Sequence, residues 1–190
     1  HAGGGLAGRR LDRAGRAAVM NVAMKQVQDY LSLYAGNRKR QDLITNMLGA
    51  VAEFKSCGIS PAQLVTTAAM TGEEVLSQKL RELALIYGAY NAVISNIGSI
   101  DPMDDLSRLA ENLKNSGYFS DMTVIVDSFT GFTRQEQAVL KQIISQCEAF
   151  EITLCCDPKT AADRGRRMND LFSTVYDTLD FFWCVWGKIV

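Results

Sequence analysis

Long hydrophobic runs are missing from the sequence. None approaches the roughly 18 to 20 uninterrupted apolar residues that a membrane helix needs, and the start lacks the charged-then-apolar pattern of a signal peptide. With 47% hydrophobic residues, 22% charged residues and a net charge of −1 over 190 residues, the composition is ordinary for a globular protein. It excludes disorder, collagen and disulfide scaffolds. We therefore expect a cytoplasmic protein with no membrane segment.

Histidine is nearly absent, and the cysteines are not paired in sequence. The single histidine is His1, and no Cys-x-x-Cys pair occurs among Cys57, Cys147, Cys155, Cys156 and Cys184. These features argue against a zinc site and against Ser-His-Asp or Cys-His catalysis. A Gly-x-x-x-x-Gly-Lys-Ser/Thr phosphate loop is also missing. We expect reduced thiols, no metal ligand and no catalytic residue in this chain.

The two ends of the chain indicate a piece of a longer protein. His1 stands where an initiator Met is expected, and the apolar run of residues 181–186 lies four residues from the end. The length suits one good core or two small ones.

Positive charge gathers near the start of the chain. The first 40 residues contain eight basic and two acidic residues, and the remainder contains 12 basic and 19 acidic ones. Arg9, Arg13 and Arg16 fall at three-to-four spacing on one helical face, with Arg10 beside them. Such a local patch can attract phosphate backbones. A solvated helix face that happens to use arginine is an equally good interpretation of the composition.

Apolar residues recur at helical spacing through the first part of the chain. The pattern predicts helices over about 11–34, 42–57, 73–95 and 101–115. Another helix is predicted to begin at Pro61, with Ser60 as its N-cap and Gln63 reaching back. Gly58 is placed to end the helix before it, and Asp101 to cap the helix that follows it.

The period of the pattern changes after residue 118. Residues 122–127 form a short β-branched run typical of a buried strand. Thr133 and Glu136 form a capping box for a helix over 134–147, a second strand is predicted over 150–156, and a last helix is predicted from near Asn169. Strand, helix and strand at this length predict a parallel βαβ unit. We thus expect a mainly α protein with a small α/β part, its sheet completed by packing helices or by strands outside this chain.

The first predicted strand ends in an acidic residue. P-loop ATPases hold Mg²⁺ with such a residue, because open α/β sheets bind ligands at the carboxyl ends of their strands. Here it is Asp127, and Ser128 stands where a working motor usually has the Glu that orients the attacking water. Serine cannot replace a carboxylate base at neutral pH, so we expect poor hydrolysis. Spacing alone favours the simpler interpretation, in which Asp127 caps the following turn.

The segment around Asp127 resembles a known family. Residues 126–136, followed by Val139 and Leu140, resemble the "DGFTGFTPQE" signature of the B subunit of the AddAB helicase-nuclease, an ATP-dependent deoxyribonuclease. In the same order along the chain, residues 53–61 resemble that family's "EFKRYGISP", residues 80–87 its "KLxDLxxIYxxY" helix, and residues 101–113 its "DxEDxLxxLAExL" stretch. Ser128 departs from the usual Gly, and Arg134 from the common Pro.

The resemblance implies a fold and a place within a larger protein. It implies a helical 1B-like region of a superfamily 1 helicase at 1–118 and a partial RecA-like 1A region at 119–190. A phosphate loop for ATP and Mg²⁺ would lie upstream of this chain, and a nuclease with an iron-sulfur cluster downstream. Asp127 and Ser128 would be the relic of a nucleotide site, with no cofactor bound by this chain itself.

The resemblance also implies partners and DNA contacts. The parent would pair with an AddA-type subunit in the bacterial cytoplasm, at the nucleoid, and process double-strand DNA ends for recombination. The implied contacts are phosphate binding by Arg9, Arg10, Arg13 and Arg16, and base contacts by Phe129, Thr130 and Phe132. Core packing of the two phenylalanines is an equal alternative. Two rival functions remain: a segment of an active helicase ATPase, and a helical protein-interaction module with no DNA role.

Overall fold

The chain folds into two compact units in a computed structural model that describes residues 8–35, 40–157 and 172–186. One unit, here called the N-terminal unit, spans Gly5–Asp105, and the C-terminal unit contains Leu106–Val190. The fold is mainly helical with two small parallel two-stranded sheets, as expected. The finer division into helicase regions at residue 118 stays a prediction.

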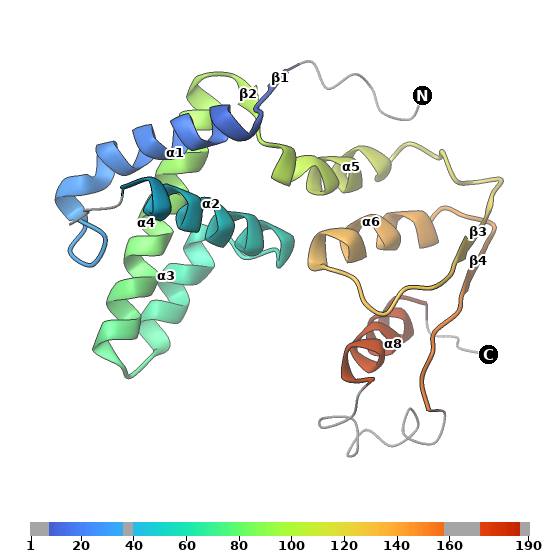
Figure 1. Cartoon of the computed structure of the whole chain (residues 1–190). Helices are drawn as coiled ribbons and strands as arrows, with labels where there is room; N and C mark the ends of the chain where they lie inside the picture. The colour runs from blue at the N-terminus through green and yellow to red at the C-terminus, as the bar shows by residue number, and fades with distance from the viewer. Residues whose placement is uncertain (1–7, 36–39, 158–171, 187–190) are drawn as a thin grey trace. The chain divides into compact units, whose positions relative to one another are not determined.

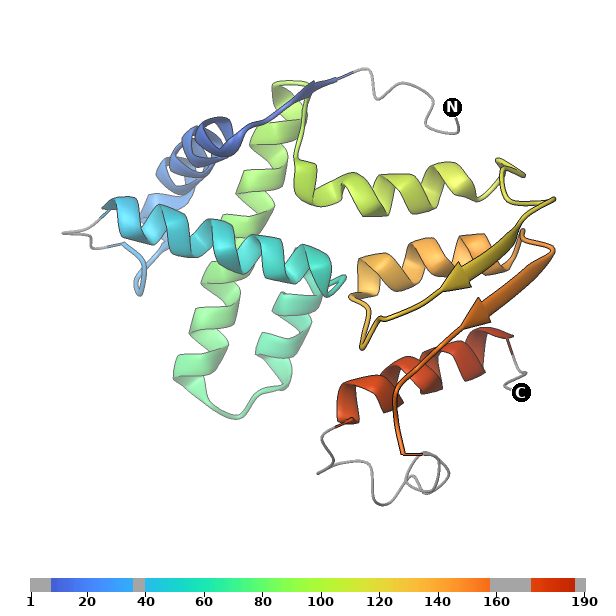
Figure 2. The same ribbon diagram turned by 45° about the vertical axis from the view of Figure 1, so that its right-hand side comes forward.

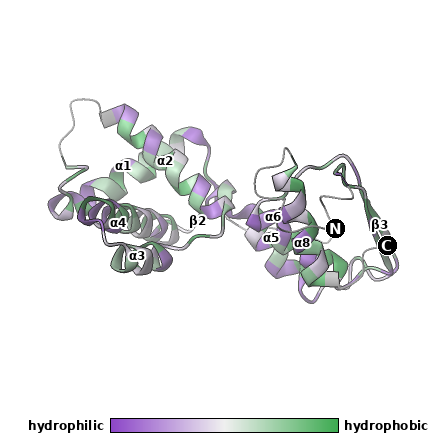
Figure 3. Cartoon of the chain, turned by 90° about the horizontal axis from the view of Figure 1, so that it is seen from below, coloured by the Kyte–Doolittle hydropathy of each residue, from purple (hydrophilic) through white to green (hydrophobic). Residues whose placement is uncertain are grey.

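Four α-helices build the N-terminal unit: α1 (Arg13–Val27), α2 (Arg40–Ser56), α3 (Pro61–Met70) and α4 (Glu74–Asn96). Helix α4 is central, because α1 and α2 cross over it and α3 lies alongside its first half (Figures 1 and 2). Apolar and polar residues are mixed along each helix (Figure 3). The largest fully buried side chains of this unit, Met20, Ile86 and Tyr90, come from α1 and α4 and are at most 1% exposed.

Local signals in the sequence set the predicted helix ends. The Ser60 side chain accepts from the backbone N–H of Gln63 while the Gln63 side chain accepts from the N–H of Ser60, so the predicted capping box is confirmed. Gly58 has φ +67° at the end of the preceding helix, a conformation that costs glycine little. Asp101 accepts from the N–H of Met103 and caps the short 3₁₀ turn Pro102–Asp104, which leads into α5 (Asp105–Leu113).

The first helix is shorter than the sequence predicted. It ends at Val27, a 3₁₀ turn follows at Gln28–Tyr30, and the chain then leaves helical geometry well before Tyr34. The cause is a long-range partner: the buried Glu82 carboxylate of α4 accepts hydrogen bonds from the backbone N–H groups of Ser32, Leu33 and Tyr34 at 2.9 to 3.2 Å. Those N–H groups therefore serve a tertiary contact rather than a helix.

A small sheet near the start of the chain was not predicted. Strand β1 (Arg9–Arg10) pairs in parallel with β2 (Ser99–Ile100), with Arg9 opposite Ser99. The two strands have two residues each and lie 90 positions apart, so no local pattern announces them. They join the start of the N-terminal unit to the segment that follows α4.

The C-terminal unit contains the predicted βαβ arrangement. Strand β3 (Thr123–Val126), α6 (Arg134–Ile144) and β4 (Ala149–Ile152) follow one another, and β3 pairs in parallel with β4 in the register Val126 to Ile152. Helix α8 (Ser173–Trp186) follows, while the predicted start near Asn169 lies outside the described residues. The core of this unit is formed by Val126, Leu140, Phe150 and Phe182.

Three predicted details of this unit are corrected. The strand predicted over 150–156 ends at Ile152 because β3 ends at Val126, its partner, and the N–H of Thr153 donates to the Val126 carbonyl as the last contact. Helix α6 ends at Ile144 instead of residue 147. The backbone N–H groups of Gln146 and Cys147 both donate to the Ile143 carbonyl and form a turn there. Strand β3 is buried on one face only, since Ile125 is 66% exposed.

Candidate nucleic-acid interface

The carboxylate of Asp127 stands at the carboxyl end of β3, where the sequence placed it. The Thr153 hydroxyl, at the end of β4, donates to Oδ1 of Asp127. That hydrogen bond, with others from the backbone N–H and hydroxyl of Ser128, holds the pKa of Asp127 below its ordinary value. The carboxylate therefore links the ends of the two strands, close to the turn-capping role that spacing alone favoured.

Ser128 adopts a backbone conformation that is uncommon for its residue type. Its φ is +64°, and no other described residue apart from glycine has a positive φ. Residues with a Cβ enter the left-handed region at a cost of roughly 1–2 kcal/mol. The chain therefore turns sharply and with strain directly after Asp127, which sends the following residues away from the strand.

The two phenylalanines of this turn differ in environment. Phe132 is half-buried and meets Phe182 of α8 nearly perpendicularly, with ring centroids 5.9 Å apart. Phe129 stacks on Phe132 at 5.1 Å and is 51% exposed. Core packing thus accounts for Phe132, while Phe129 presents a ring to solvent. Its contact with a base stays a prediction.

Helix α8 holds the turn in place, a feature that the sequence did not reveal. The hydroxyl of Thr178, which is 2% exposed, lies 3.5 Å from the carbonyl of Thr130. A Cβ added to Gly131 would meet the methyl group of Thr174 at 2.6 Å. Thr130 itself is exposed. Glycine at this position therefore lets α8 approach the turn without a shift of Thr174.

The four N-terminal arginines fall into two classes. Arg16 is 16% exposed at its side chain, and its Nε lies 3.1 Å from Oδ1 of Asp101. Arg10 forms an exposed ion pair with Asp105. Within the described ranges, Arg9 and Arg13 are exposed and have no carboxylate partner. Phosphate contact stays a prediction for all four, and Arg9 and Arg13 are the two whose charge is not already engaged.

A buried polar network surrounds Asp101, which is fully buried. Its Oδ2 accepts from Lys55 Nζ at 2.9 Å and from the Tyr90 hydroxyl at 3.0 Å, and Lys55 also reaches Asp104 at 2.7 Å. Burial alone would raise the pKa of Asp101, but the hydrogen bond and charge of Lys55, the Met103 N–H and the charge of Arg16 together lower it. Side chains of α1, α2 and α4 thus meet at the segment before α5.

Sequence reasoning missed this network because it used Asp101 only as a cap. The position of Lys55 indicated a buried partner, because Lys55 lies on α2 beside Phe54 in an otherwise apolar stripe. Burying an unpaired cation there would cost free energy. The partner could not be identified from the sequence, because Asp101 lies 46 positions away.

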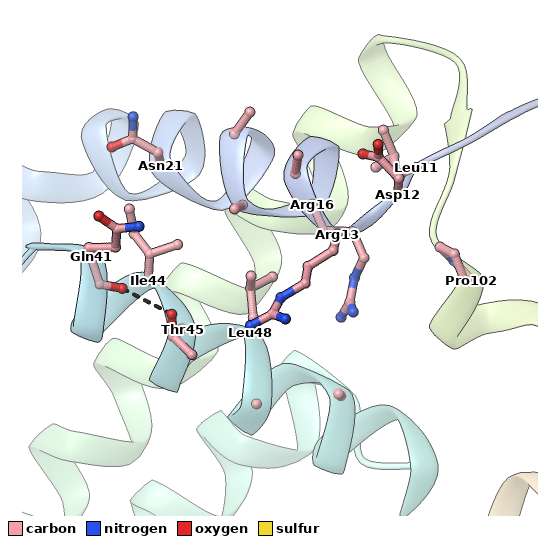
Figure 4. Close-up of a pocket in the computed structure, with 15 residues that line it drawn as sticks. Leu11, Asp12, Arg13, Arg16, Asn21, Gln41, Ile44, Thr45, Leu48 and Pro102 are labelled. Carbon is pink, nitrogen blue, oxygen red and sulfur yellow. Dashed lines mark hydrogen bonds between the residues drawn. The ribbon is translucent and has the colours of Figure 1, made fainter.

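A groove of about 1230 Å³ lies between α1 and α2 (Figure 4). Arg13 and Arg16 extend from α1 toward α2 near Leu48, whereas Gln41 and Ile44 of α2 lie farther along the groove, opposite Asn21. Small residues on both helices, among them Ala17 and Gly49, keep the groove open. Polar side chains lie at both ends of the groove, and Ile44 and Leu48 supply apolar surface between them.

Neither a metal cluster nor a membrane-spanning helix occurs among the described residues. No group of three or more His, Cys, Asp or Glu side chains in the described ranges is arranged to hold a metal ion. No helix in the part of the chain that the structure describes is long and apolar enough to cross a membrane.

Fold and site together define a mainly helical protein with a small βαβ unit, an acidic residue at the carboxyl end of its first strand, and a basic N-terminal groove. A family profile described as "ADDB, N-terminal" matches residues 1–182. The chain belongs to this family.

Relatives share one description, the B subunit of an ATP-dependent helicase/deoxyribonuclease. The chain is 33% identical over 178 residues to the protein so named from Thermoanaerobacter sp. (strain X514), covering 93% of this chain and 15% of the relative. It is 33% identical over 172 residues to the counterpart from Moorella thermoacetica, covering 88% and 15%. The counterpart in Caldanaerobacter subterraneus is 28% identical over 155 residues, covering 82% and 13%. The chain thus spans about 15% of the length of these relatives.

Proposed function

We propose that the chain is a DNA-engaging segment of a helicase-like B subunit within an ATP-dependent helicase-nuclease that processes double-strand DNA ends for recombinational repair. The observation that carries the proposal is the family match over residues 1–182, together with the name of the relatives. Because the chain spans about 15% of those relatives, the ATP, Mg²⁺, iron-sulfur cluster and AddA-type partner of the whole protein belong to the proposal. So does a cytoplasmic, nucleoid-associated location.

The two units would belong to two parts of a helicase. The helical N-terminal unit would be the 1B-like region, and the C-terminal unit would contribute a βαβ piece of the RecA-like 1A core. The parallel pairing of β3 with β4 and the position of Asp127 at the strand end support the second assignment. The exposed outer face of β3, marked by Ile125, suits a sheet whose second face is covered by other parts of the parent.

This segment would be a degenerate motor that does not hydrolyse ATP. The carboxylate of Asp127 is already hydrogen-bonded by Thr153 and Ser128, and a serine follows it instead of a glutamate. Mg²⁺ is usually held by one or two carboxylates together with substrate phosphates. At the end of β3 this chain offers one carboxylate, that of Asp127, which already accepts hydrogen bonds from Thr153 and Ser128, and its sequence has no phosphate loop. Its residues do not fit a Mg²⁺ site by themselves, so no step of hydrolysis is assigned to them.

One observation favours a rival function, a protein-interaction module. An apolar groove of about 640 Å³ lies between α3 and α4, lined by Val65, Leu85 and Gly88. Met70, at the end of α3, is 82% exposed. Exposed apolar surface of this kind is typical of protein contacts.

Single-stranded DNA binding by the full chain, measured against salt, decides between the two functions. If the N-terminal arginines contact phosphates, the logarithm of the affinity should fall linearly with the logarithm of the salt concentration, with a slope of about −0.7 for each contact. ATP hydrolysis by the complete B subunit should stay at background. A slope near zero would remove the DNA role and leave the interaction module, and robust hydrolysis would instead support an active motor.

A further inference from the structure

We propose that the groove between α1 and α2 binds a single nucleic-acid strand. In this proposal Arg13 contacts a phosphate of the strand, whereas Arg16 lines the groove, is held by its ion pair with Asp101 and makes no phosphate contact. This inference rests on the proposed function and deepens it, because it assigns DNA engagement to one surface and separates arginines that the sequence treated alike.

Arg13 and Arg16 lie one helical turn apart on α1, and both line the groove (Figure 4). The charge of Arg16 is balanced, because Arg16 and Lys55 together face Asp101 and Asp104. Arg13 is exposed and, within the described ranges, meets no carboxylate. It is therefore the groove's available cation, while Arg16 is held by the network.

The acidic residue at the same end does not cancel this charge. Asp12 also lines the groove, but its Oδ1 accepts from the backbone N–H of Gly15 at 2.7 Å and caps α1. A carboxylate at a helix N-terminus is stabilised there by the partial positive charge of the helix end. One oxygen of this carboxylate is thus committed to the cap of α1, and Arg13 is the exposed cation at this end of the groove.

The size and lining of the groove favour an extended polymer over a small molecule. Its volume of about 1230 Å³ exceeds the range of about 300–1,000 Å³ that is typical of small-molecule pockets. Ile44 and Leu48 supply apolar floor, and Gln41 supplies an amide, at points along α2 beyond Arg13. Proteins that bind single strands without sequence preference combine a positively charged groove for the backbone with aromatic side chains on which bases stack. This groove offers the positive charge of Arg13 and apolar surface, but its lining contains no aromatic residue, so we expect it to hold a strand by its backbone rather than by base stacking.

Positive charge gathers near the start of the chain, where the first 40 residues contain eight basic and two acidic side chains. Helix α8, which holds the Phe129 turn, has two acidic residues and no basic one. A cationic contact with phosphates is therefore expected near the start of the chain rather than at α8.

Filling the groove tests the inference, and the chain offers a matched control. Gly49 lines the α1–α2 groove and Gly88 lines the α3–α4 groove; both lie within helices, and an added Cβ meets nothing within 4 Å at either position. Gly49→Leu should lower the affinity of the full chain for a mixed-sequence single-stranded oligonucleotide at least tenfold. Gly88→Leu should leave that affinity unchanged. Circular dichroism melting of both variants checks the fold.

A second variant does not depend on how the groove accommodates a leucine. Arg13→Ala removes an exposed side chain that has no carboxylate partner among the described residues. The fold should therefore persist, and the slope of log affinity against log salt should shrink by about 0.7. If Gly49→Leu and Arg13→Ala both bind the oligonucleotide as tightly as the wild type does, the assignment of DNA binding to this groove is wrong, and the proposed DNA role stays intact. Equal losses in Gly49→Leu and Gly88→Leu would overturn it too. No salt-dependent binding by the wild type would instead remove the proposed function itself.

Discussion

The residue that departs most from ordinary backbone geometry is Ser128. Its positive φ sets the direction of the turn that carries Phe129, and its N–H and hydroxyl both serve the Asp127 carboxylate. Strain at a residue with a Cβ persists only where its surroundings hold it. Here the surroundings are the Asp127 carboxylate before it and the contacts of α8 after it.

Two substitutions at Ser128 separate strain from hydrogen bonding. Ser128→Ala removes the hydroxyl and keeps the strain, whereas Ser128→Gly removes both. The glycine variant should therefore be more stable than the alanine variant by about 1 kcal/mol, as measured by urea unfolding at neutral pH. Equal stabilities would mean that the positive φ costs nothing here.

Glu82 makes the stability of the N-terminal unit depend on pH. It is 3% exposed. Burial by itself would raise its pKa, but hydrogen bonds from Gln78 and from the N–H groups of Ser32, Leu33 and Tyr34 lower it from 4.5 to about 2. Because the folded pKa is depressed, the stabilisation is complete above pH 4.5 and is lost as the pH falls toward 2.

Replacing Glu82 by glutamine should reveal this window. Glu82→Gln should cost about 2–3 kcal/mol in the free energy of unfolding at pH 7, because the charged acceptor of three backbone N–H groups is lost. The difference from the wild type should shrink between pH 4.5 and 2, where the wild-type carboxyl also becomes neutral. Denaturant unfolding at about pH 7, 4 and 2.5 measures it, and a difference independent of pH would contradict the assignment.

At the scale of elements, the sequence predicted what local signals control. The capping boxes at Ser60 and Thr133 were found because both partners lie within four residues. The βαβ unit was found because the hydrophobic period changes at 122. Each of these features depends on contacts between near neighbours in sequence.

Elements whose limits depend on distant partners were missed or misjudged. Helix α1 ends early because Glu82, about 50 positions away, takes the N–H groups after it. Strand β4 is short because β3 is short, and β1 exists only because β2 returns beside it. In the candidate site the sequence identified Asp127 and the arginines, but the ion pair of Arg16 and the contact of α8 with Gly131 required tertiary structure.

At the scale of the molecule, each compact unit has a buried cluster of its own. In the N-terminal unit the charged network of Asp101 adjoins this cluster. In the C-terminal unit the buried polar side chains among the described residues, Gln135 and Thr178, are uncharged. Removing one partner of a buried ion pair costs about 3–5 kcal/mol, because the other charge is left without compensation. The network therefore gives a way to weaken one unit selectively.

Lys55→Met replaces the buried ammonium with an apolar group of similar length. Asp104 loses its ion pair with Lys55, and Asp101 keeps Arg16, the Tyr90 hydroxyl and the Met103 N–H. We expect amide hydrogen exchange in α1, α2 and α4 to accelerate by a factor of about 100 or more, which corresponds to about 3 kcal/mol, while exchange in β3 and α6 stays at the wild-type rate. Lys25→Met, at an exposed position of α1, is the matched control and should change neither. Acceleration in both units alike would show that the chain opens as one cooperative body rather than as two.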